Sequence, residues 1–287
     1  MKLATIHNTD STSAAVIVDA TDGARAIALP ATDVGTLLGD PNWRSVAEQA
    51  DAAEGQPLDD VRLACPSLTP SKVVCVGLNY RSHILEMGRD LPTHPTLFAK
   101  FASNLIGPCD DVLLPPNSTE VDWEAELAIV IGSPVRRASR EEAVAAIAGY
   151  TILNDVSMRD WQWRTTQWLQ GKAFDASTPV GPYLVTADEV DPDQTGAPAL
   201  DIRCDVNGET MQQANTGDLL FTPADAVAYV SQFTSLAPGD IIATGTPGGV
   251  GASRDPKRFL QQADVLTTEI EGLGRQVNGC IATSDDT

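Results

Sequence analysis

The stretch VDWEAELAIVIG, residues 121–132, decides more about the fold than any other part of this 287-residue chain. Residues 127–131 are uniformly apolar, which is typical of a strand that enters a buried core. Because a strand turns successive side chains to opposite faces, the acids Asp122, Glu124 and Glu126 share one face. Like charges on a core-bound strand raise one another's pKa unless a cation lies between them. The spacing therefore indicates either a solvated strand face or a functional site.

A third carboxylate favours a metal site. Asp155 follows the strand-like run YTIL, residues 150–153, at the point where a loop begins. Three carboxylates, with water completing the coordination shell, suit a hard divalent ion such as Mg²⁺, Mn²⁺ or Ca²⁺. Zinc fits less well because the sequence has no cluster of Cys and His residues. We therefore predict that Glu124, Glu126 and Asp155 hold a divalent metal ion.

Strand-like segments outnumber helix-like ones and do not alternate with them regularly. This pattern disfavours a Rossmann or TIM arrangement and predicts a β-rich α+β fold. A capping box formed by Ser139 and Glu142 predicts a helix over residues 141–150, and Thr222 followed by proline predicts another over 224–236. Further strands are expected within residues 73–80, 150–158, 239–251 and 264–274.

The first 68 residues are predicted to form a small α/β domain of their own, with residues 69–287 forming the larger, catalytic domain. This division is predicted because short strand-like segments and two helical stretches are followed by a linker with two prolines. The segments are residues 1–7, 14–19 and 26–29 for the strands, 33–38 and 43–53 for the helices, and 65–72 for the linker.

Composition and charge limit the partners. With 39 acidic and 19 basic residues the formal net charge is −20, which argues against nucleic-acid binding because phosphates require clustered Lys and Arg. No apolar run approaches the ~20 residues that span a bilayer, and the N-terminus lacks the apolar segment of a signal peptide. Five scattered cysteines without zinc spacing predict reduced, mostly buried thiols. We expect a cytoplasmic protein with neither a nucleic-acid nor a membrane partner.

Three further features carry candidate chemistry. His83 lies three residues before Glu86, a helical spacing that places both on one side and lets the carboxylate orient the imidazole as a base. Lys172 stands among small and apolar neighbours and, if buried, needs an anionic partner. The Gly-rich run 245–251 can present backbone N–H groups and the Thr246 hydroxyl to an anion. Taken alone, the His83–Glu86 pair is more typical of a structural contact, Lys172 is also compatible with a surface lysine, and the Gly-rich run is also compatible with a simple turn.

Taken together and in order, these motifs resemble the fumarylacetoacetate hydrolase family. The resemblance covers roughly residues 70–280, and no single motif carries it. The matching segments are GLNYRSHILEM (77–87), DWEAELAIVIG (122–132), NDVSMRDWQ (154–162), GKAFDASTPVGP (171–182) and GDIIATGTPGGVG (239–251).

The resemblance implies a mixed β-sandwich roll, usually dimeric, preceded by a small N-terminal domain. It also implies roles for individual residues, and the sequence departs from the family pattern at none of the metal, dyad or lysine positions. The implied roles are Mg²⁺ or Mn²⁺ ligation by Glu124, Glu126 and Asp155, a base dyad of His83 and Glu86, an active-site cation at Lys172, and contacts to substrate oxygens by Arg159, Gln162 and Thr246.

The activity implied is metal-dependent hydrolysis of the C–C bond of an acylpyruvate-type acid, such as fumarylpyruvate or acetylpyruvate, in aromatic-compound catabolism. The alternatives on the same site are decarboxylation of oxaloacetate, isomerisation or tautomerisation of a 2-hydroxydienoate, and hydratase or dehydratase action on a 2-oxo acid. A metal-stabilised binding or structural dimer is the alternative outside enzymes. The His83–Glu86 pair favours hydrolysis, because decarboxylation needs no attacking water. Residues 87–96 and 161–169 are interpreted as lids that set specificity.

Overall fold

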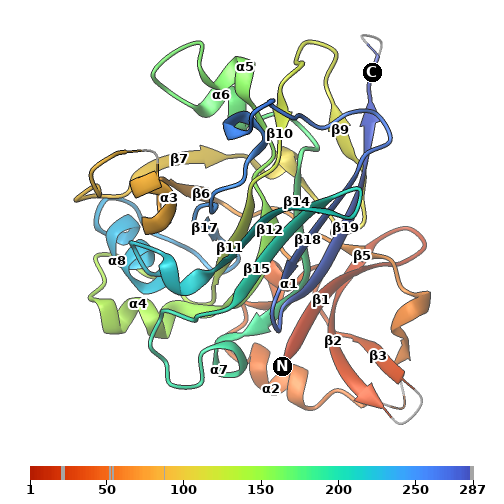
Figure 1. Ribbon diagram of the computed structural model, residues 1–287. Helices are drawn as coiled ribbons and strands as arrows, with labels where there is room; N and C mark the ends of the chain where they lie inside the picture. The colour runs from red at the N-terminus through yellow and green to blue at the C-terminus, as the bar shows by residue number, and fades with distance from the viewer. Residues whose placement is uncertain (21–22, 52, 54, 87, 285–287) are drawn as a thin grey trace.

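One large sheet runs through the molecule, and the strands that form the site lie toward one edge of it (Figure 1). The computed structural model describes residues 1–20, 23–51, 53, 55–86 and 88–284, and within these the sheet has 12 strands. Two short strands lie off its main path: β5 (Leu63–Ala64) pairs with β1, and β8 (Leu105–Ile106) pairs with β14. The path runs β4 (Gln56–Pro57), β3 (Gly23–Ala28), β2 (Thr12–Ala20), β1 (Lys2–His7), β14 (Thr178–Thr186), β12 (Ile147–Asn154), β11 (Ala125–Ile131), β17 (Ile241–Ala243), β6 (Val73–Gly77) and β7 (Thr96–Lys100).

A second sheet crosses β11 and β12, and the largest hydrophobic core lies between the two (Figure 1). Ile129 and Ile152 from the first sheet share this core with Ile202 and Leu266 from the second. A separate pair, β10 (Val121–Asp122) with β13 (Ser157–Met158), lies beside the site. This arrangement confirms the predicted β-rich α+β fold. The second sheet has the order β16 (Glu209–Asn215), β15 (Asp201–Val206), β18 (Val265–Ile270), β19 (Gly274–Ala282) and β9 (Val112–Leu114).

The described helices are short, and none is long and apolar enough to cross a membrane. Ser139 and Glu142 form the predicted capping box at the start of α4, and α8 begins at Thr222 and Pro223 as predicted, with a further capping box between Thr222 and Asp225. The α-helices are α1 (Val34–Leu37), α2 (Trp43–Glu48), α3 (Arg81–Glu86), α4 (Arg140–Ala146), α5 (Arg159–Gln162), α6 (Leu169–Lys172), α7 (Ala187–Val190) and α8 (Pro223–Phe233). The 3₁₀ turns are η2 (Leu58–Asp60), η3 (Ala102–Asn104), η4 (Thr216–Asp218) and η5 (Gly251–Ser253).

Several predicted boundaries were wrong. The helix predicted over 141–150 ends at Ala146, because Ile147 already begins β12, which is buried along its whole length and paired on both sides. Tertiary burial overrides helix propensity here. The strand predicted over 73–80 ends at Gly77, since Leu78 has a φ of 56°. The helix predicted over 43–53 ends at Glu48.

The strand predicted over 121–132 is interrupted at Trp123 and Glu124, so β10 and β11 belong to different sheets. Met87, which begins one expected lid, and Ala52 lie outside the described residues. The cysteines match expectation, with Cys109 exposed and the other four buried and free.

The N-terminal strands extend the large sheet, because β1 pairs with β14 through Lys2 and Leu3. The helices α1 and α2 cover a second hydrophobic cluster, which Val130 and Ala148 reach from the central strands. Residues 1–68 therefore share both a sheet and a core with the rest of the chain. Their division into a separate domain stays a prediction.

Gly149 marks a close approach between β12 and β14, and its replacement tests that packing. A Cβ at Gly149 would lie 2.1 Å from the Val185 carbonyl oxygen and 2.8 Å from the Thr186 Cα, so backbone would have to move. We expect Gly149→Ala to lower the free energy of unfolding by about 1–3 kcal/mol, measured by urea denaturation. As a control, a Cβ at Gly39 meets only the Thr36 carbonyl oxygen, at 3.1 Å. An equal loss in Gly39→Ala would contradict this explanation.

Candidate active site

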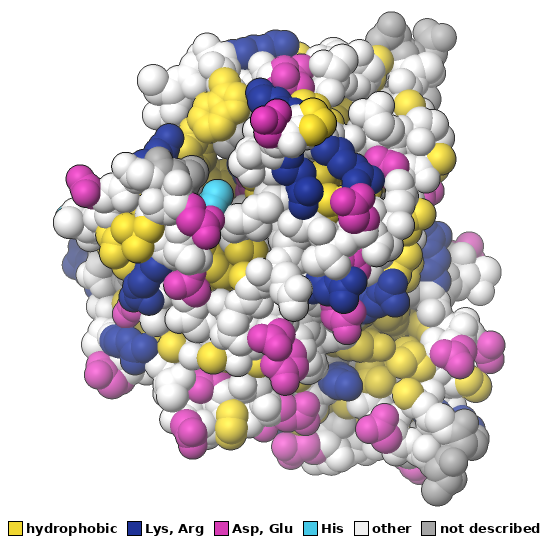
Figure 2. Space-filling view, viewed as in Figure 1, with side chains coloured by type: hydrophobic (Ala, Val, Ile, Leu, Met, Phe, Trp, Pro, Cys, Tyr) yellow, Lys and Arg dark blue, Asp and Glu magenta, His cyan; other side chains and the backbone are white. Residues whose placement is uncertain are grey.

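A pocket of about 320 Å³ opens at the end of the large sheet where β6, β7 and β11 meet α3, α5 and α6. Figure 2 shows Lys and Arg side chains around the hollowed upper part of this face. The pocket contains all but two of the residues predicted for the site. The predicted residues that line it are His83, Glu124, Glu126, Arg159, Gln162, Lys172 and Thr246, whereas Asp155 lies buried behind the wall and Glu86 lies exposed outside it.

The three predicted metal ligands come together at the break between β10 and β11. Carboxylate oxygens of Glu124, Glu126 and Asp155 lie within 4.8 Å of one another, and all three residues are buried. The break is held in place because the Glu124 N–H donates to Asn154 Oδ1 at 2.9 Å and the Asp155 N–H donates to the Glu124 carbonyl at 2.8 Å. Because all three residues are buried, these acids do not form the solvent-exposed strand face that was the alternative to a functional site.

Three buried cations bind these acids. Lys172 Nζ lies 2.6 Å from Glu124 Oε2 and 2.7 Å from Asp155 Oδ2. Arg159 Nη1 lies 2.6 Å from Glu124 Oε1, and Lys100 Nζ lies 2.9 Å from Asp155 Oδ1. Lys172 therefore has the anionic partners that its burial requires. We did not predict a role for Lys100. It follows the apolar run TLFA, however, and a lysine in an apolar context is the same feature that identified Lys172.

The cations affect the pKa values of the neighbouring acids unequally. Burial would lower the pKa of Lys172, but Asp155 and Glu124 hold it above its ordinary value. Burial would raise the pKa of Asp155, but Lys100 and Lys172 hold it below its ordinary value. The pKa of Glu126 is raised well above its ordinary value by burial and then by the charges of Asp155 and Glu124. Glu126 is thus the acid whose charge the cations compensate least.

The donor set fits a hard divalent cation. A fourth buried acid, Asp122, is bound to Arg159, so four acids share three cations, and Glu126 is the one that forms no ion pair among the described residues. Glu126 Oε2 accepts the Gly245 N–H at 2.7 Å, and no described residue donates to its other oxygen. Three neighbouring carboxylates with no His or Cys among them can bind a divalent metal of the Mg²⁺, Mn²⁺ or Ca²⁺ type.

Asp122 positions Arg159 and the Gly-rich loop, a role that its place on the acidic face did not reveal. Its carboxylate accepts from Arg159 Nε at 2.8 Å, from the Gly251 N–H at 2.7 Å and from the Ala252 N–H at 2.9 Å. Arg159 Nη1 also donates to Gln162 Oε1 at 2.9 Å. The two residues predicted to contact substrate oxygens are thereby fixed side by side on one wall of the pocket.

Thr246 lies in the pocket, but its hydroxyl already has partners. Its O–H donates to the Ala125 carbonyl at 2.9 Å and its oxygen accepts from Gln212 Nε2 at 2.8 Å. Gln212 also donates to the Pro247 carbonyl and accepts the Ala125 N–H, which ties the Gly-rich loop to β11. We did not predict a role for Gln212, because nothing in the surrounding sequence MQQAN distinguishes this glutamine from an ordinary strand residue.

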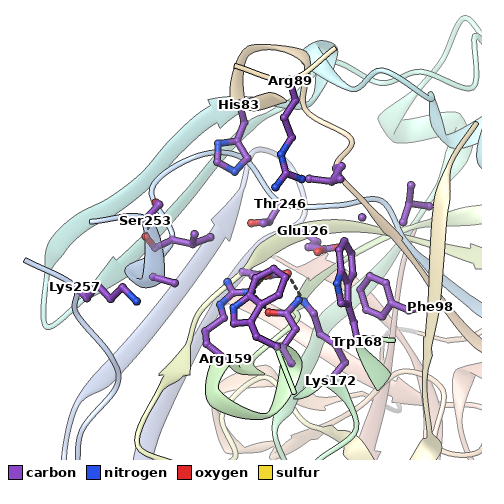
Figure 3. A pocket seen from close by; sticks show the side chains of 18 residues that line it. His83, Arg89, Phe98, Glu126, Arg159, Trp168, Lys172, Thr246, Ser253 and Lys257 are labelled. Carbon is purple, nitrogen blue, oxygen red and sulfur yellow. Dashed lines mark hydrogen bonds and ion pairs between the residues drawn. The ribbon is translucent and has the colours of Figure 1, made fainter. Parts of the chain in front are cut away.

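His83 lies on the opposite side of the pocket from Lys172 and Arg159 (Figure 3). Its Nδ1 and a carboxylate oxygen of Glu86 both face Gly248, where an added Cβ would lie 3.2 Å from the first and 3.5 Å from the second. No hydrogen bond joins the two side chains in the part of the chain that the structure describes. Burial lowers the pKa of His83, and the nearby Glu86 charge opposes this only in part. The imidazole is therefore neutral at pH 7 and can accept a proton.

An aromatic wall closes one side of the pocket. Trp168 meets Phe98 edge to face at 5.7 Å between ring centroids, and Trp163 meets Trp168 in the same way at 6.3 Å. Lys172 Nζ lies 4.9 Å from the centroid of Phe98. Of the three tryptophans in this stretch, Trp161 does not line the pocket and packs against a phenylalanine outside it.

Comparison with known proteins agrees with this geometry. Residues 72–281 match the sequence model of the fumarylacetoacetate (FAA) hydrolase C-terminal domain. A human protein named mitochondrial oxaloacetate tautomerase is 48% identical over 239 residues, covering 82% of this chain and 74% of the relative. A 2,4-didehydro-3-deoxy-L-rhamnonate hydrolase from Sphingomonas sp. (strain SKA58) is 44% identical over 239 residues, covering 81% of each.

Solved structures extend the likeness over the whole fold. A fumarylacetoacetate hydrolase from Exiguobacterium antarcticum superposes with a TM-score of 0.85 at 32% identity, covering 99% of this chain and 100% of its own. A 2-hydroxyhepta-2,4-diene-1,7-dioate isomerase from Mycobacterium marinum gives 0.80 at 35% identity, with the same coverage. The resemblance and the fold predicted from the sequence are confirmed. The chain belongs to the fumarylacetoacetate hydrolase family.

Proposed function

We propose that the chain is a divalent-metal-dependent tautomerase that interconverts the keto and enol forms of a 2-oxo dicarboxylic acid such as oxaloacetate. The observation that carries the proposal is a neutral imidazole facing, across one pocket, a buried carboxylate cluster with fixed cations. Relatives named oxaloacetate tautomerase, at up to 48% identity, support this activity over the acylpyruvate hydrolysis expected from the sequence.

Tautomerisation moves one proton and breaks no C–C bond. The C3–H bond breaks, its electron pair forms the C2=C3 double bond, and the C2 oxygen gains a proton. His83 is the residue of the chain suited to take the C3 proton, because its neutral form prevails at pH 7. Lys172 stays protonated, since its acidic neighbours hold its pKa high, and its charge offsets the negative charge that develops on the C2 oxygen.

Glu124, Glu126 and Asp155 would hold Mg²⁺ or Mn²⁺, which as a Lewis acid polarises the 2-oxo group. Arg159 and Gln162 hold the carboxylate next to that group by their fixed N–H donors. Glu86 faces the same point as His83, and its charge partly opposes the lowering of the His83 pKa by burial. Lys100 holds Asp155 in place from behind the site.

A second candidate is hydrolysis of a C–C bond in a 2,4-dioxo acid, which the hydrolase from Sphingomonas favours. The same neutral His83 would then activate a water molecule instead of taking a carbon-bound proton. Tautomerisation and hydrolysis both require an enolate, so the site residues alone do not distinguish one reaction from the other.

We propose a homodimer that uses Mg²⁺ or Mn²⁺, a cytoplasmic location and a place in aromatic-compound catabolism. The vertebrate relatives carry names that assign those proteins to mitochondria.

The first prediction from the proposed function concerns the reaction itself. Metal-stripped protein resupplied with Mg²⁺ or Mn²⁺ should speed the equilibration of enol and keto oxaloacetate, followed by ultraviolet absorbance, with no change in product mass. Acetylpyruvate offered in parallel should be left intact. Release of pyruvate and acetate from acetylpyruvate, with oxaloacetate untouched, would establish the hydrolase instead.

The second prediction concerns the metal. Glu126→Gln removes the least compensated carboxylate of the cluster and should weaken Mn²⁺ binding by about tenfold or more, measured by calorimetry. Glu141→Gln removes an exposed acid from the first turn of α4 and serves as the matched control. Equal Mn²⁺ affinity in both variants would remove Glu126 from the ligand set.

The third prediction concerns pH. Because the pKa of His83 lies below its ordinary value of 6.5, the rate should hold constant from pH 8 to 7 and fall only at lower pH, as the imidazole gains a proton. In His83→Gln, kcat should fall about 10²- to 10⁴-fold, and the decrease in rate at low pH (the acid limb of the profile) should disappear. His7→Gln, on an exposed histidine of β1, should leave the profile unchanged. An acid limb that persists in His83→Gln would assign the base to another group.

A further inference from the structure

The helix that carries His83 has little apolar packing to hold it. Ile84 is the one buried residue among the six of α3, all of which the structure describes, and His83 is half-buried. The other four residues are exposed. Most of the stability of a short helix comes from packing of an apolar face, because its own hydrogen bonds do not suffice. Other contacts must therefore set the direction in which the His83 imidazole points.

Polar contacts to one neighbouring segment provide this support. The segment is residues 216–222, which leads from β16 through η4 into α8 and lies beside the start of α3 (Figure 1). Asn79 donates from Nδ2 to the Phe221 carbonyl at 2.9 Å and accepts the Phe221 N–H at 2.8 Å. Arg81, the first residue of α3, donates to the Leu219 carbonyl at 2.9 Å. The start of the helix is thus joined to segment 216–222 by two side chains.

Asp218, in the same segment, makes the contact nearest to His83. Its Oδ2 accepts the Ser82 N–H at 3.0 Å and the Ser82 hydroxyl at 2.6 Å. An N–H in the first turn of a helix has no partner within that helix, so a carboxylate there satisfies it and also interacts favourably with the helix dipole. Ser82 directly precedes His83 in the chain. Asp218 therefore fixes the first turn of α3 at the residue next to the imidazole.

We propose that Asp218 is a positioning residue, which orients the His83 imidazole in the pocket through Ser82 and the first turn of α3. The inference rests on the proposed function, in which His83 takes the proton, and it adds a residue that does not itself line the pocket. A base transfers a proton only from within hydrogen-bonding reach of it, so a small displacement of the helix costs rate.

The predicted metal ligands lie outside this support. They are on and beside β11 and β12, and no hydrogen bond or ion pair among the described residues joins the Asp218 side chain to Glu124, Glu126 or Asp155. Loss of the Asp218 carboxylate should therefore affect the base without affecting metal binding, which separates positioning of His83 from general damage to the site.

The test uses three substitutions at the contact and one control. Asp218→Ala removes the acceptor, Asp218→Asn keeps an oxygen that can accept, and Ser82→Ala removes only an exposed hydroxyl. The control, Glu142→Ala, removes a carboxylate that accepts the Ser139 N–H at 2.7 Å at the start of α4, outside the pocket. Each variant is measured for kcat and KM on oxaloacetate, for Mn²⁺ affinity by calorimetry, and, with Mg²⁺, for the imidazole NMR resonances of its histidines.

We expect Asp218→Ala to lower kcat about ten- to a hundredfold, with KM and Mn²⁺ affinity changed about twofold or less, and to shift the resonances of His83 but not those of His7. Asp218→Asn should recover most of the rate. Ser82→Ala should act in the same direction with a smaller loss, about two- to fivefold. Glu142→Ala should leave kcat and the His83 resonances unchanged.

Unchanged His83 resonances in Asp218→Ala, or an unchanged kcat in that variant of an active protein, would overturn the inference. A loss of kcat in Glu142→Ala equal to that in Asp218→Ala would also overturn it, because helix capping in general would then limit the rate. If Asp218→Ala does not fold, Ser82→Ala decides by the same measurements. Shifted His83 resonances in a protein that does not tautomerise oxaloacetate would uphold the positioning role and refute the proposed function.

Discussion

The ion-pair cluster beneath the pocket is the constraint on which the rest of the site depends. Asp155 is completely buried, and such a carboxylate is tolerated only because Lys100 and Lys172 bind its two oxygens. Lys172 in turn is tolerated only because Asp155 and Glu124 accept its charge. The members stabilise one another, so the cluster has no part that can be removed without leaving an unpaired buried charge. A site built in this way holds its side chains in fixed positions, which is what a metal centre requires.

The fold supplies this geometry through an interruption in a strand. If residues 121–132 formed one unbroken strand, Glu124 and Glu126 would lie two positions apart along a straight edge. The break after Asp122 separates β10 from the large sheet. The Glu124 N–H at the break donates to Asn154 Oδ1. The Gly-rich loop then closes over the break, held by Gln212 and by Asp122. This interruption of the strand lies where the three carboxylates converge.

Much of this site could be predicted from sequence because charge in an apolar context is itself informative. Alternating acids on a core-bound strand, and a lysine among small residues, both imply partners. Lys100 shows the same signal, yet it was missed because no matched motif contained it. Gln212 could not be found, since its role depends on contacts between segments far apart in sequence. The boundary at Ile147 failed for a related reason: helix and buried strand compete for the same apolar residues, and pairing with β11 and β14 decides the outcome.

The choice between tautomerase and hydrolase depends on what shares the pocket with the enolate. A neutral His83 can take a proton from carbon or from water, so its pKa alone favours neither reaction. Hydrolysis additionally needs a water molecule held between the base and the distal carbonyl. The aromatic wall of Trp163, Trp168 and Phe98 makes one side of the pocket largely apolar, so the hydrogen-bonding groups that could hold this water lie on its other sides. The buried cations would stabilise the enolate in either reaction, so the fate of the substrate, and not the geometry of these residues, distinguishes a tautomerase from a hydrolase.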